Sequence, residues 1–319
     1  MGYLYALLAA VLFGINGSVT RVVIEAGLTP AQLTLVRVAT TAVIAAAFLL
    51  MRDRAAFKIS LRQVLILALL GVTGVALLQF TYATAISLLP VGITLLIEYT
   101  AVLMVAVIAW AFFKEKVRAR LWIAIALVLA GLTVVARVWD SELNAVGVAF
   151  AFAAALSLTI YFLGGEREVA KSSPMAVAFW TMTFATLFWL VFSEWWTIDP
   201  GLFTTPVSLQ GNLDSVMVPV WVPLLWNMLL GSFAPFFFSL LALRYLSATA
   251  AGIVATAEVI LAFFFAWVWL GEGLDTVQTI GAGLVLLGVV IAQTARQNKV
   301  VDADLAIPDA APPSATRSR

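Results

Sequence analysis

The chain has 319 residues, of which 63% are hydrophobic and only 11% are charged, and its mean hydropathy is +1.07. A soluble domain could not bury so much apolar surface, so the composition places the chain among integral membrane proteins. The sequence contains no cysteine and no histidine, which excludes disulfides, thiolate nucleophiles, imidazole bases and nearly all zinc or iron chemistry. The net charge of +1 gives no sign of a nucleic-acid partner.

Apolar runs long enough to cross a bilayer, about 20 residues each, recur along the chain. They predict helices over residues 3–24, 30–51, 62–86, 91–113, 120–138, 145–164, 174–195, 219–243, 249–270 and 274–295. Proline, whose missing N–H is not needed at a helix start, is expected to open four of them, at Pro30, Pro90, Pro174 and Pro219. The first run lacks a basic leader and a small-residue cleavage site, so we expect a retained helix and not a signal peptide.

The connections divide into a basic set and a set with almost no basic residues. If the N-terminus is cytoplasmic, fifteen Lys and Arg residues lie inside and only Arg21 and Arg137 lie outside, with Arg37 within the second helix. This asymmetry predicts a multi-pass membrane protein with two cytoplasmic termini. Residues 196–218 are expected to form a polar loop, and residues 296–319 a disordered cytoplasmic tail.

An internal repeat is visible. Residues 89–131 align without gaps to residues 246–288 after a shift of 157, with ten of 43 positions identical, including Glu115 and Glu272. A shift of 144 aligns Pro30 with Pro174. We therefore predict an all-α membrane protein of ten transmembrane helices, built as a 5+5 inverted repeat with copies at 1–139 and 145–295. Inverted repeats are typical of secondary transporters, which bind substrate between the copies near the membrane midplane.

These features resemble the drug/metabolite transporter superfamily in its EamA-type branch. The resemblance rests on the 5+5 helices and on the segments FFKEKV (112–117), WLGEGL (269–274), TPAQLTLVR (29–37), LVLAGLTVV (127–135) and LVLLGVVIA (284–292). It implies a central cavity lined by helices 1, 3, 4, 6, 8 and 9, with helices 5 and 10 at the periphery and alternating access by rocking of the two halves. Within the branch, the aromatic content and the long connection at 196–218 are most similar to a bacterial aromatic amino acid exporter.

Glu98 is the first candidate site residue, because a charge inside hydrocarbon is costly and generally functional. It lies about 12 Å from the outer end of its helix, at 1.5 Å per residue. It could bind a substrate ammonium group or carry a coupling proton, and the alternative is a structural pair with Arg37. For Arg37 itself we favour a structural role. Glu258 is a second candidate near the middle of helix 9, but its counterpart in the repeat is Ala101, so the two carboxylates are not symmetry mates.

Polar and aromatic residues within other helices complete the candidate substrate site. Gln79 and Tyr82 share a face of helix 3, and Tyr99 follows Glu98. Ser157 and Tyr161 share a face of helix 6, and Asn16 lies between Gly14 and Gly17 of helix 1. On helix 8, Phe237 belongs to an aromatic stripe beside Pro235, which is expected to kink the helix. Hydroxyl tips on aromatic walls would suit an amphipathic ligand, although packing against other helices or lipid explains each residue as well.

Glu115 and Glu272 recur at matched helix ends, which favours a structural task such as pairing with Lys116 or capping a neighbouring helix. The sequence thus predicts a secondary transporter exporting small amphipathic metabolites, most of all amino acids including aromatic ones, with a proton as a possible co-substrate and no cofactor or metal. No nucleotide-binding motif is present. The alternatives are a membrane-embedded enzyme, a receptor-like membrane protein, and an exporter of cationic drugs, nucleosides or sugar derivatives.

Overall fold

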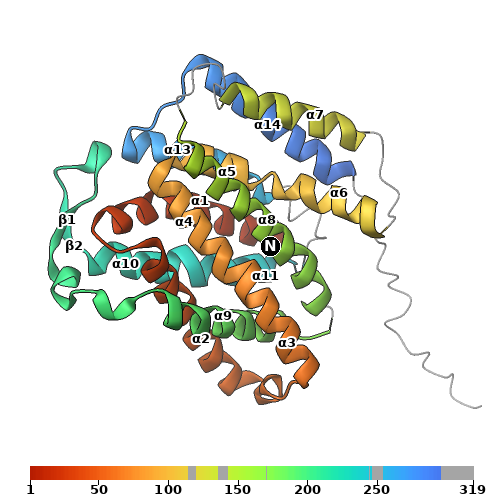
Figure 1. The fold of residues 1–319 in the computed structure, drawn as a ribbon, viewed down its shortest axis with the longest axis vertical. Coiled ribbons are helices and arrows are strands. Elements are labelled where there is room, and N and C mark those ends of the chain that lie inside the picture. The colour runs from red at the N-terminus through yellow and green to blue at the C-terminus, as the bar shows by residue number, and fades with distance from the viewer. Residues whose placement is uncertain (114–119, 136–142, 170, 244, 246–253, 296–319) are drawn as a thin grey trace, which may run out of the picture.

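The computed structural model describes residues 1–113, 120–135, 143–169, 171–243, 245 and 254–295. Within these ranges the chain is a bundle of packed helices with one small hairpin at its edge (Figure 1). Glu115, Lys116 and the tail 296–319, for which the sequence gives expectations, lie outside the described residues.

The helices follow the apolar runs closely. The α-helices are α1 (Gly2–Glu25), α2 (Pro30–Arg52), α3 (Leu61–Leu70), α4 (Leu77–Leu88), α5 (Val91–Glu98), α6 (Ala101–Phe113), α7 (Arg120–Val135), α8 (Ala145–Val169), α9 (Pro174–Phe192), α10 (Trp221–Met228), α11 (Ala234–Leu243), α13 (Ala257–Phe265) and α14 (Thr276–Ala295). Three π-helical segments join or extend them, namely η2 (Gly71–Ala76), η6 (Leu229–Phe233) and η7 (Ala266–Leu270), and four 3₁₀ turns occupy connections, namely η1 (Arg54–Phe57), η3 (Trp195–Thr197), η4 (Pro200–Thr204) and η5 (Gly211–Leu213).

Six described helical stretches are long and apolar enough to cross a membrane, and they overlap the runs expected for helices 1, 2, 3, 6, 7 and 8, with ends that differ by up to five residues. Shorter apolar stretches of the described chain occupy the other four runs, at Val91–Val105, Trp122–Val135, Ala257–Leu270 and Thr276–Ile291. The described chain is therefore mostly helical, and its apolar helices are consistent with the predicted all-α membrane protein.

Local sequence explains the helix starts. Thr29 caps α2 through a hydrogen bond from Gln32 N (3.2 Å), and Gln32 Oε1 accepts from Thr29 N (3.0 Å), with Pro30 at the first helical position. Ser173 caps α9 before Pro174 by accepting a single hydrogen bond from Ala176 N (3.3 Å), without the reciprocal bond. The prediction that Pro219 opens helix 8 is wrong. Pro219 pairs with Pro206 at the end of a strand, and α10 begins two residues later.

The connection 196–218 is more structured than its polar composition suggests. It contains an antiparallel hairpin of β1 (Pro206–Ser208) and β2 (Met217–Pro219), at the left of Figure 1. The indole Nε1 of Trp269 donates to Leu209 O (2.7 Å), and Asn212 Nδ2 donates to Val268 O (2.9 Å). The hairpin is therefore fastened to the end of η7.

Helices α7 and α14 pack against each other along one edge of the bundle (Figure 1). A methyl group on Gly131 would lie 2.7 Å from the carbonyl oxygen of Gly281, and one on Gly288 would lie 2.8 Å from that of Ala124. The sequence shift of 157 aligns Gly131 with Gly288 and Ala124 with Gly281. The two contacts are therefore reciprocal, as a local pseudo-twofold axis requires.

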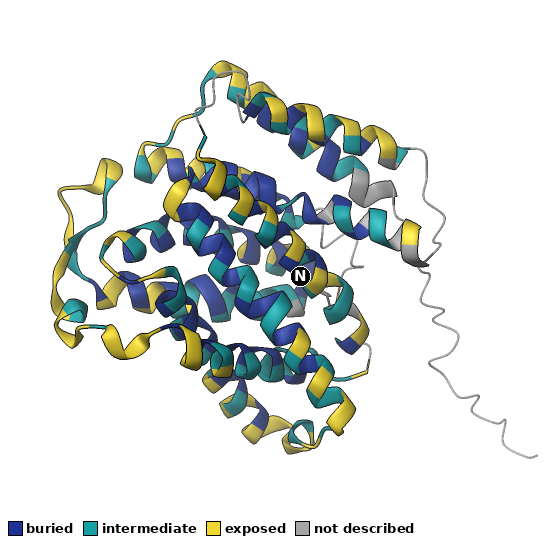
Figure 2. Cartoon of the chain, viewed as in Figure 1, coloured by how far each residue is buried: buried dark blue, intermediate teal, exposed yellow. Residues whose placement is uncertain are grey.

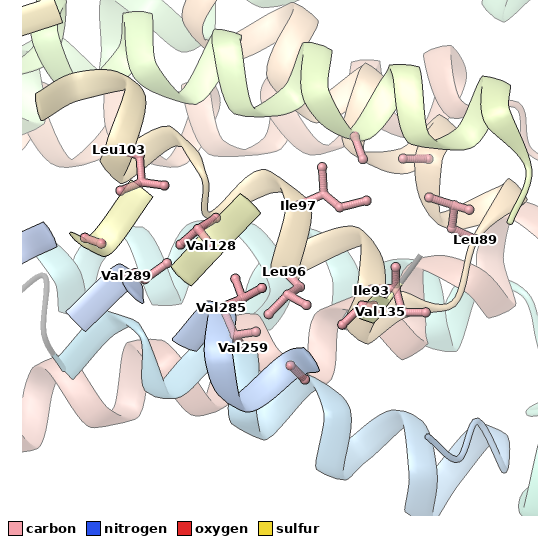
Figure 3. Close-up of a cluster of buried hydrophobic side chains, with 14 residues drawn as sticks. Leu89, Ile93, Leu96, Ile97, Leu103, Val128, Val135, Val259, Val285 and Val289 are labelled. Carbon is pink, nitrogen blue, oxygen red and sulfur yellow. The ribbon is translucent and has the colours of Figure 1, made fainter. Parts of the chain in front are cut away.

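The largest buried apolar cluster joins α5 and α6 to α7, α13 and α14. Figure 3 shows its labelled members, Leu89, Ile93, Leu96, Ile97, Leu103, Val128, Val135, Val259, Val285 and Val289. Large apolar side chains such as Leu65, Leu129 and Ile280 are exposed on the outer faces of the peripheral helices, which appear yellow in Figure 2. An apolar exterior around a packed interior is expected where lipid is the solvent.

Candidate functional site

The helix that carries Glu98 is interrupted at that residue. α5 ends at Glu98, Tyr99 and Thr100 form a turn, and α6 begins at Ala101. The turn is closed by Thr100 Oγ1, which donates to Ile97 O (2.7 Å), and by Leu103 N, which donates to Thr100 O (2.9 Å). Discontinuous helices expose backbone groups that can meet a ligand inside the membrane.

A second interruption occurs at the position that the sequence shift of 157 aligns with the first. Thr256 forms a turn immediately before α13, and the shift of 157 converts Tyr99 to Thr256. Here Val259 N donates to Thr256 O (3.2 Å), with the three-residue spacing of the first turn but one residue out of register with it, because the shift of 157 aligns Thr100 with Ala257. The two interruptions therefore share their position under the shift.

The π-helical segments η2 and η6 are also matched. The same shift places residues 72–76 on residues 229–233, which are the bounds of η6. A π-helical turn contains one extra residue, which changes the direction in which the following side chains point. Such segments are frequent at functional sites. Gln79 and Tyr82 follow η2, and Ser232 lies within η6.

Arg37 is bound to η6. Its Nε donates to Ser232 Oγ (2.8 Å) and its Nη2 donates to Gly231 O (3.3 Å). Pro235 lies four residues after Gly231 and has no N–H, so it cannot donate the usual helical hydrogen bond to that carbonyl. The proline thereby leaves Gly231 O available to the guanidinium, which the prediction of a simple kink at Pro235 did not anticipate.

The two candidate carboxylates are close enough for their charges to interact, although the repeat alignment does not pair them. Tyr99 Oη donates to Glu258 Oε2 (2.6 Å) and also approaches Ala255 O (3.2 Å). Tyr82 lies within electrostatic range of both carboxylates, and its hydroxyl would lie 3.1 Å from a methyl group on Gly17 of α1. Residues of α1, α4, α5 and α13 thus meet at one place.

The open question of a pair between Glu98 and Arg37 has a definite geometric answer. Their charges interact, but no ion pair joins them within the described part of the chain. Arg37 is bound to Ser232 and Gly231 instead.

Several buried polar atoms around these residues have no hydrogen-bond partner within the described ranges. They are Asn16 Oδ1, Arg37 Nη1, both side-chain amide atoms of Gln79, and Glu98 Oε2. A buried polar group left unsatisfied costs about 1–3 kcal/mol, and a charged group costs more. A concentration of such groups in one region is typical of a site that binds a polar ligand or water.

Three predicted residues do not join this group. Tyr161 packs among aromatic side chains, with its ring centroid 6.4 Å from that of Phe236. Phe237 stacks on Phe233 at 6.1 Å. Ser157 is buried on α8, but no hydrogen bond links it to either carboxylate in the described chain.

Sequence reasoning missed two polar contacts between helices. Ser232 binds Arg37, and Asn227 Nδ2 of α10 donates to Thr20 Oγ1 of α1 (2.9 Å). Small hydroxyl and amide residues are common in membrane helices, so they give little signal alone. Both residues lie on the helical turns before Pro235, and this closeness to a helix-disrupting proline is the sequence feature that could have pointed to them.

Glu272 has the structural task expected of it. Its Oε2 accepts from the backbone N–H of Val91 (2.8 Å), which caps α5, and its Oε1 lies 3.3 Å from Arg21 Nη2. Burial raises the pKa of the Glu272 carboxyl, while Arg21 and the Val91 N–H act in the opposite direction. The prediction that Glu272 caps a neighbouring helix is confirmed.

Comparison with known proteins agrees with this geometry. The model of the EamA-like transporter family matches residues 1–137 and again residues 145–294. The chain is 23% identical over 241 residues to the uncharacterized transporter YdfC of Bacillus subtilis (strain 168), covering 75% of this chain and 74% of that protein. It also resembles a protein of known crystal structure, with a TM-score of 0.60 and 17% identity over 92% of this chain and 97% of the other, which supports the fold alone. Since the family model covers most of its length, the chain belongs to the EamA-like transporter family of the drug/metabolite transporter superfamily, and is a membrane transporter of that type.

Proposed function

We propose that this protein is a secondary active exporter in which two inverted five-helix repeats, residues 1–139 and 145–295, rock about a shared substrate site. Three matched features support the proposal: the family model matches twice, the helix interruptions at Tyr99 and Thr256 coincide under the repeat shift, and the contacts of Gly131 and Gly288 are reciprocal. Ten membrane spans follow if the four shorter apolar stretches also cross the bilayer.

The membrane is the bacterial inner membrane, as the resemblance to bacterial exporters implies, and both termini are cytoplasmic. The excess of fifteen basic residues over two between the two sets of connections supports this orientation. In this orientation the β1–β2 hairpin lies on the outer side. Trp195, Trp196 and Trp221 are exposed near the hairpin, where indole rings favour the membrane interface.

The substrate is a small amphipathic metabolite, most of all an amino acid, with aromatic amino acids included. The observation that carries this proposal is the group of buried, unpartnered polar atoms beside the interruption at Glu98. Of the residues named from the sequence, Glu98, Tyr99, Tyr82, Gln79, Asn16 and Glu258 are the proposed substrate-binding residues, and the roles predicted for Ser157, Tyr161 and Phe237 are not part of the proposal because these three do not join the group. Energy comes from the substrate gradient or from a proton.

Flux in proteoliposomes tests the proposal. The purified chain is reconstituted, the vesicles are loaded with labelled L-phenylalanine, and efflux is compared with protein-free vesicles. We expect efflux that saturates and that unlabelled L-phenylalanine on the opposite side accelerates. Efflux equal to that of empty vesicles for a panel of amino acids would refute amino acid export. Mass spectrometry of the released compound separates transport from membrane-embedded catalysis, because a transporter leaves the molecule unchanged.

A further inference from the structure

Arg37 and Glu98 are a basic and an acidic side chain that no ion pair joins within the described chain. Their exposed fractions are 4% and 8%, so both side chains are more than nine-tenths buried. Within the described residues, Arg37 Nη1 and Glu98 Oε2 have no partner, although the two charges are near enough to interact. A positive and a negative group therefore lie in one polar region without forming a pair.

The protein holds the two groups apart. The edge of the guanidinium that carries Nε and Nη2 is bound by Ser232 Oγ and Gly231 O, which leaves Nη1 unbound. Glu98 is fixed at the last residue of α5, immediately before the turn at Tyr99. Because each group is set by its own helical segment, the separation is built into the fold.

We propose that Arg37 and Glu98 bind the two ends of a zwitterionic head group, with the carboxylate at Arg37 Nη1 and the ammonium at Glu98. The inference rests on the proposed transport function and assigns Arg37, which the sequence favours as structural, to substrate selection. A substrate with an ammonium and a carboxylate on adjacent atoms satisfies both buried charges, whereas a simple cation or anion leaves one of them unpaired. An unpaired buried charge is strongly unfavourable, so the pair selects for zwitterions.

Two further unpartnered groups fit the same head group. Asn16 lies against Gly231, whose carbonyl holds Arg37, since a methyl group on Gly231 would fall 1.8 Å from Asn16 Oδ1. Gln79, one turn before Tyr82, has an unbonded donor and an unbonded acceptor. An ammonium group offers three donors and a carboxylate offers about four acceptor sites, so these amides complement both ends.

A simple cation between the two carboxylates is the competing occupant. It is disfavoured because Tyr99 already donates to Glu258, and because the charge of Arg37 acts on the same region as that of Glu98. Arg37 repels a cation that carries no carboxylate of its own.

Three probes that share a phenyl group on a two-carbon chain, and differ in their charged groups, test this inference. They are L-phenylalanine, phenethylamine, which lacks the carboxylate, and 3-phenylpropionate, which lacks the ammonium. The readouts are the thermal shift of the purified full-length protein with each probe and inhibition of L-phenylalanine efflux. We expect the wild type to favour L-phenylalanine over either analogue by about tenfold or more, the size expected for a hydrogen-bonded charge.

Variants of Arg37 and Glu98 test recognition of the carboxylate and of the ammonium separately. Arg37→Gln should abolish discrimination against phenethylamine and keep discrimination against 3-phenylpropionate, and Glu98→Gln should do the reverse. Arg37→Lys should keep part of the preference, because it keeps the charge and loses the fork of donors. Arg54→Gln removes a charge from η1, just after α2, and Glu168→Gln removes one at the end of α8, and both should leave all three affinities unchanged.

Each failure has its own meaning. Equal binding of L-phenylalanine and phenethylamine by the wild type, or an equal loss of all three probes in Arg37→Gln, would overturn the inference. Failure of L-phenylalanine to shift the melting temperature would overturn it too. Binding with the expected preference but without efflux above empty vesicles would uphold the inference and refute the proposed transport of this amino acid.

Discussion

Glu272 Oε2 accepts a hydrogen bond of 2.8 Å from the backbone N–H of Val91, the first residue of α5, although 181 positions separate them. Pro90, which precedes Val91, forms no side-chain cap with this helix. The second half of the chain therefore caps the helix that ends at Glu98, and Arg21 of α1 pairs with the same carboxylate. A single side chain thus connects the two halves at the start of the site-bearing helix.

Glu272→Ala should lower the melting temperature, because it leaves the Val91 N–H without its acceptor. Loss of a helix cap costs about 1 kcal/mol, which corresponds to roughly 2–4 °C for a chain of this size. Glu272→Gln should lose much less, since its amide oxygen can still accept that hydrogen bond. Differential scanning fluorimetry in detergent measures both. Glu25→Gln, which alters the longer 3.9 Å pair with Arg21, serves as the control and should change little. Equal melting temperatures for Ala and Gln variants would contradict the capping role.

The raised pKa of Glu272 predicts a pH dependence with a definite sign. A carboxyl whose pKa is higher in the folded state holds its proton more tightly there, so its contribution to stability is greatest below its ordinary pKa. That contribution is lost as the pH rises through the folded pKa. The melting temperature of the wild type should therefore fall relative to that of Glu272→Gln as the pH rises from about 4 to about 7. A difference that stays constant, or that changes in the opposite direction, would refute the shift.

The seam between α7 and α14 predicts matched sensitivity to added volume. Gly131→Ala and Gly288→Ala each place a methyl group against a backbone carbonyl, so each should destabilise by about 1–3 kcal/mol. Gly283, on the same helix as Gly288, has no atom within 4 Å of the added methyl, so Gly283→Ala should stabilise slightly through helix propensity. Thermal unfolding of the three variants is the measurement. A loss in only one of the two seam variants would argue against the reciprocal contact.

Sequence reasoning located the helices because apolar runs of membrane length are an unusually strong signal, and it selected Glu98 and Glu258 because carboxylates in such runs are rare. It also recognised that Glu258 has no acidic counterpart in the repeat, but it did not foresee that the helix is interrupted at Tyr99. A one-turn interruption leaves the spacing of apolar residues unchanged on both sides, so the sequence pattern does not reveal it. Ser232 and Gly231 were missed for a related reason, because their partner Arg37 is 194 and 195 positions away and neither residue carries charge.

The hydroxyl of Tyr99 provides a test of the carboxylate geometry. Tyr99→Phe removes the 2.6 Å hydrogen bond to Glu258 Oε2 and keeps the ring. Hydrogen bonds to charged groups contribute about 1.5–3 kcal/mol, so L-phenylalanine efflux should fall by roughly one to two orders of magnitude. Tyr245→Phe removes an exposed hydroxyl near Tyr5 and should have no effect. Unchanged efflux in Tyr99→Phe would place this pair outside the transport cycle.

Pro235→Ala tests whether a missing N–H holds Arg37 in place. Alanine supplies a donor that can compete for Gly231 O, so the bond from Arg37 Nη2 should weaken and the guanidinium should become free to move toward Glu98. We expect discrimination between L-phenylalanine and phenethylamine to fall severalfold without loss of folding, because a restored helical hydrogen bond stabilises the helix. Pro223→Ala is the matched control. Pro223 lies in the first turn of α10, where an N–H has no partner within the helix, so its replacement should leave selectivity unchanged. Equal selectivity in the wild type and Pro235→Ala would show that Ser232 alone fixes the position of Arg37.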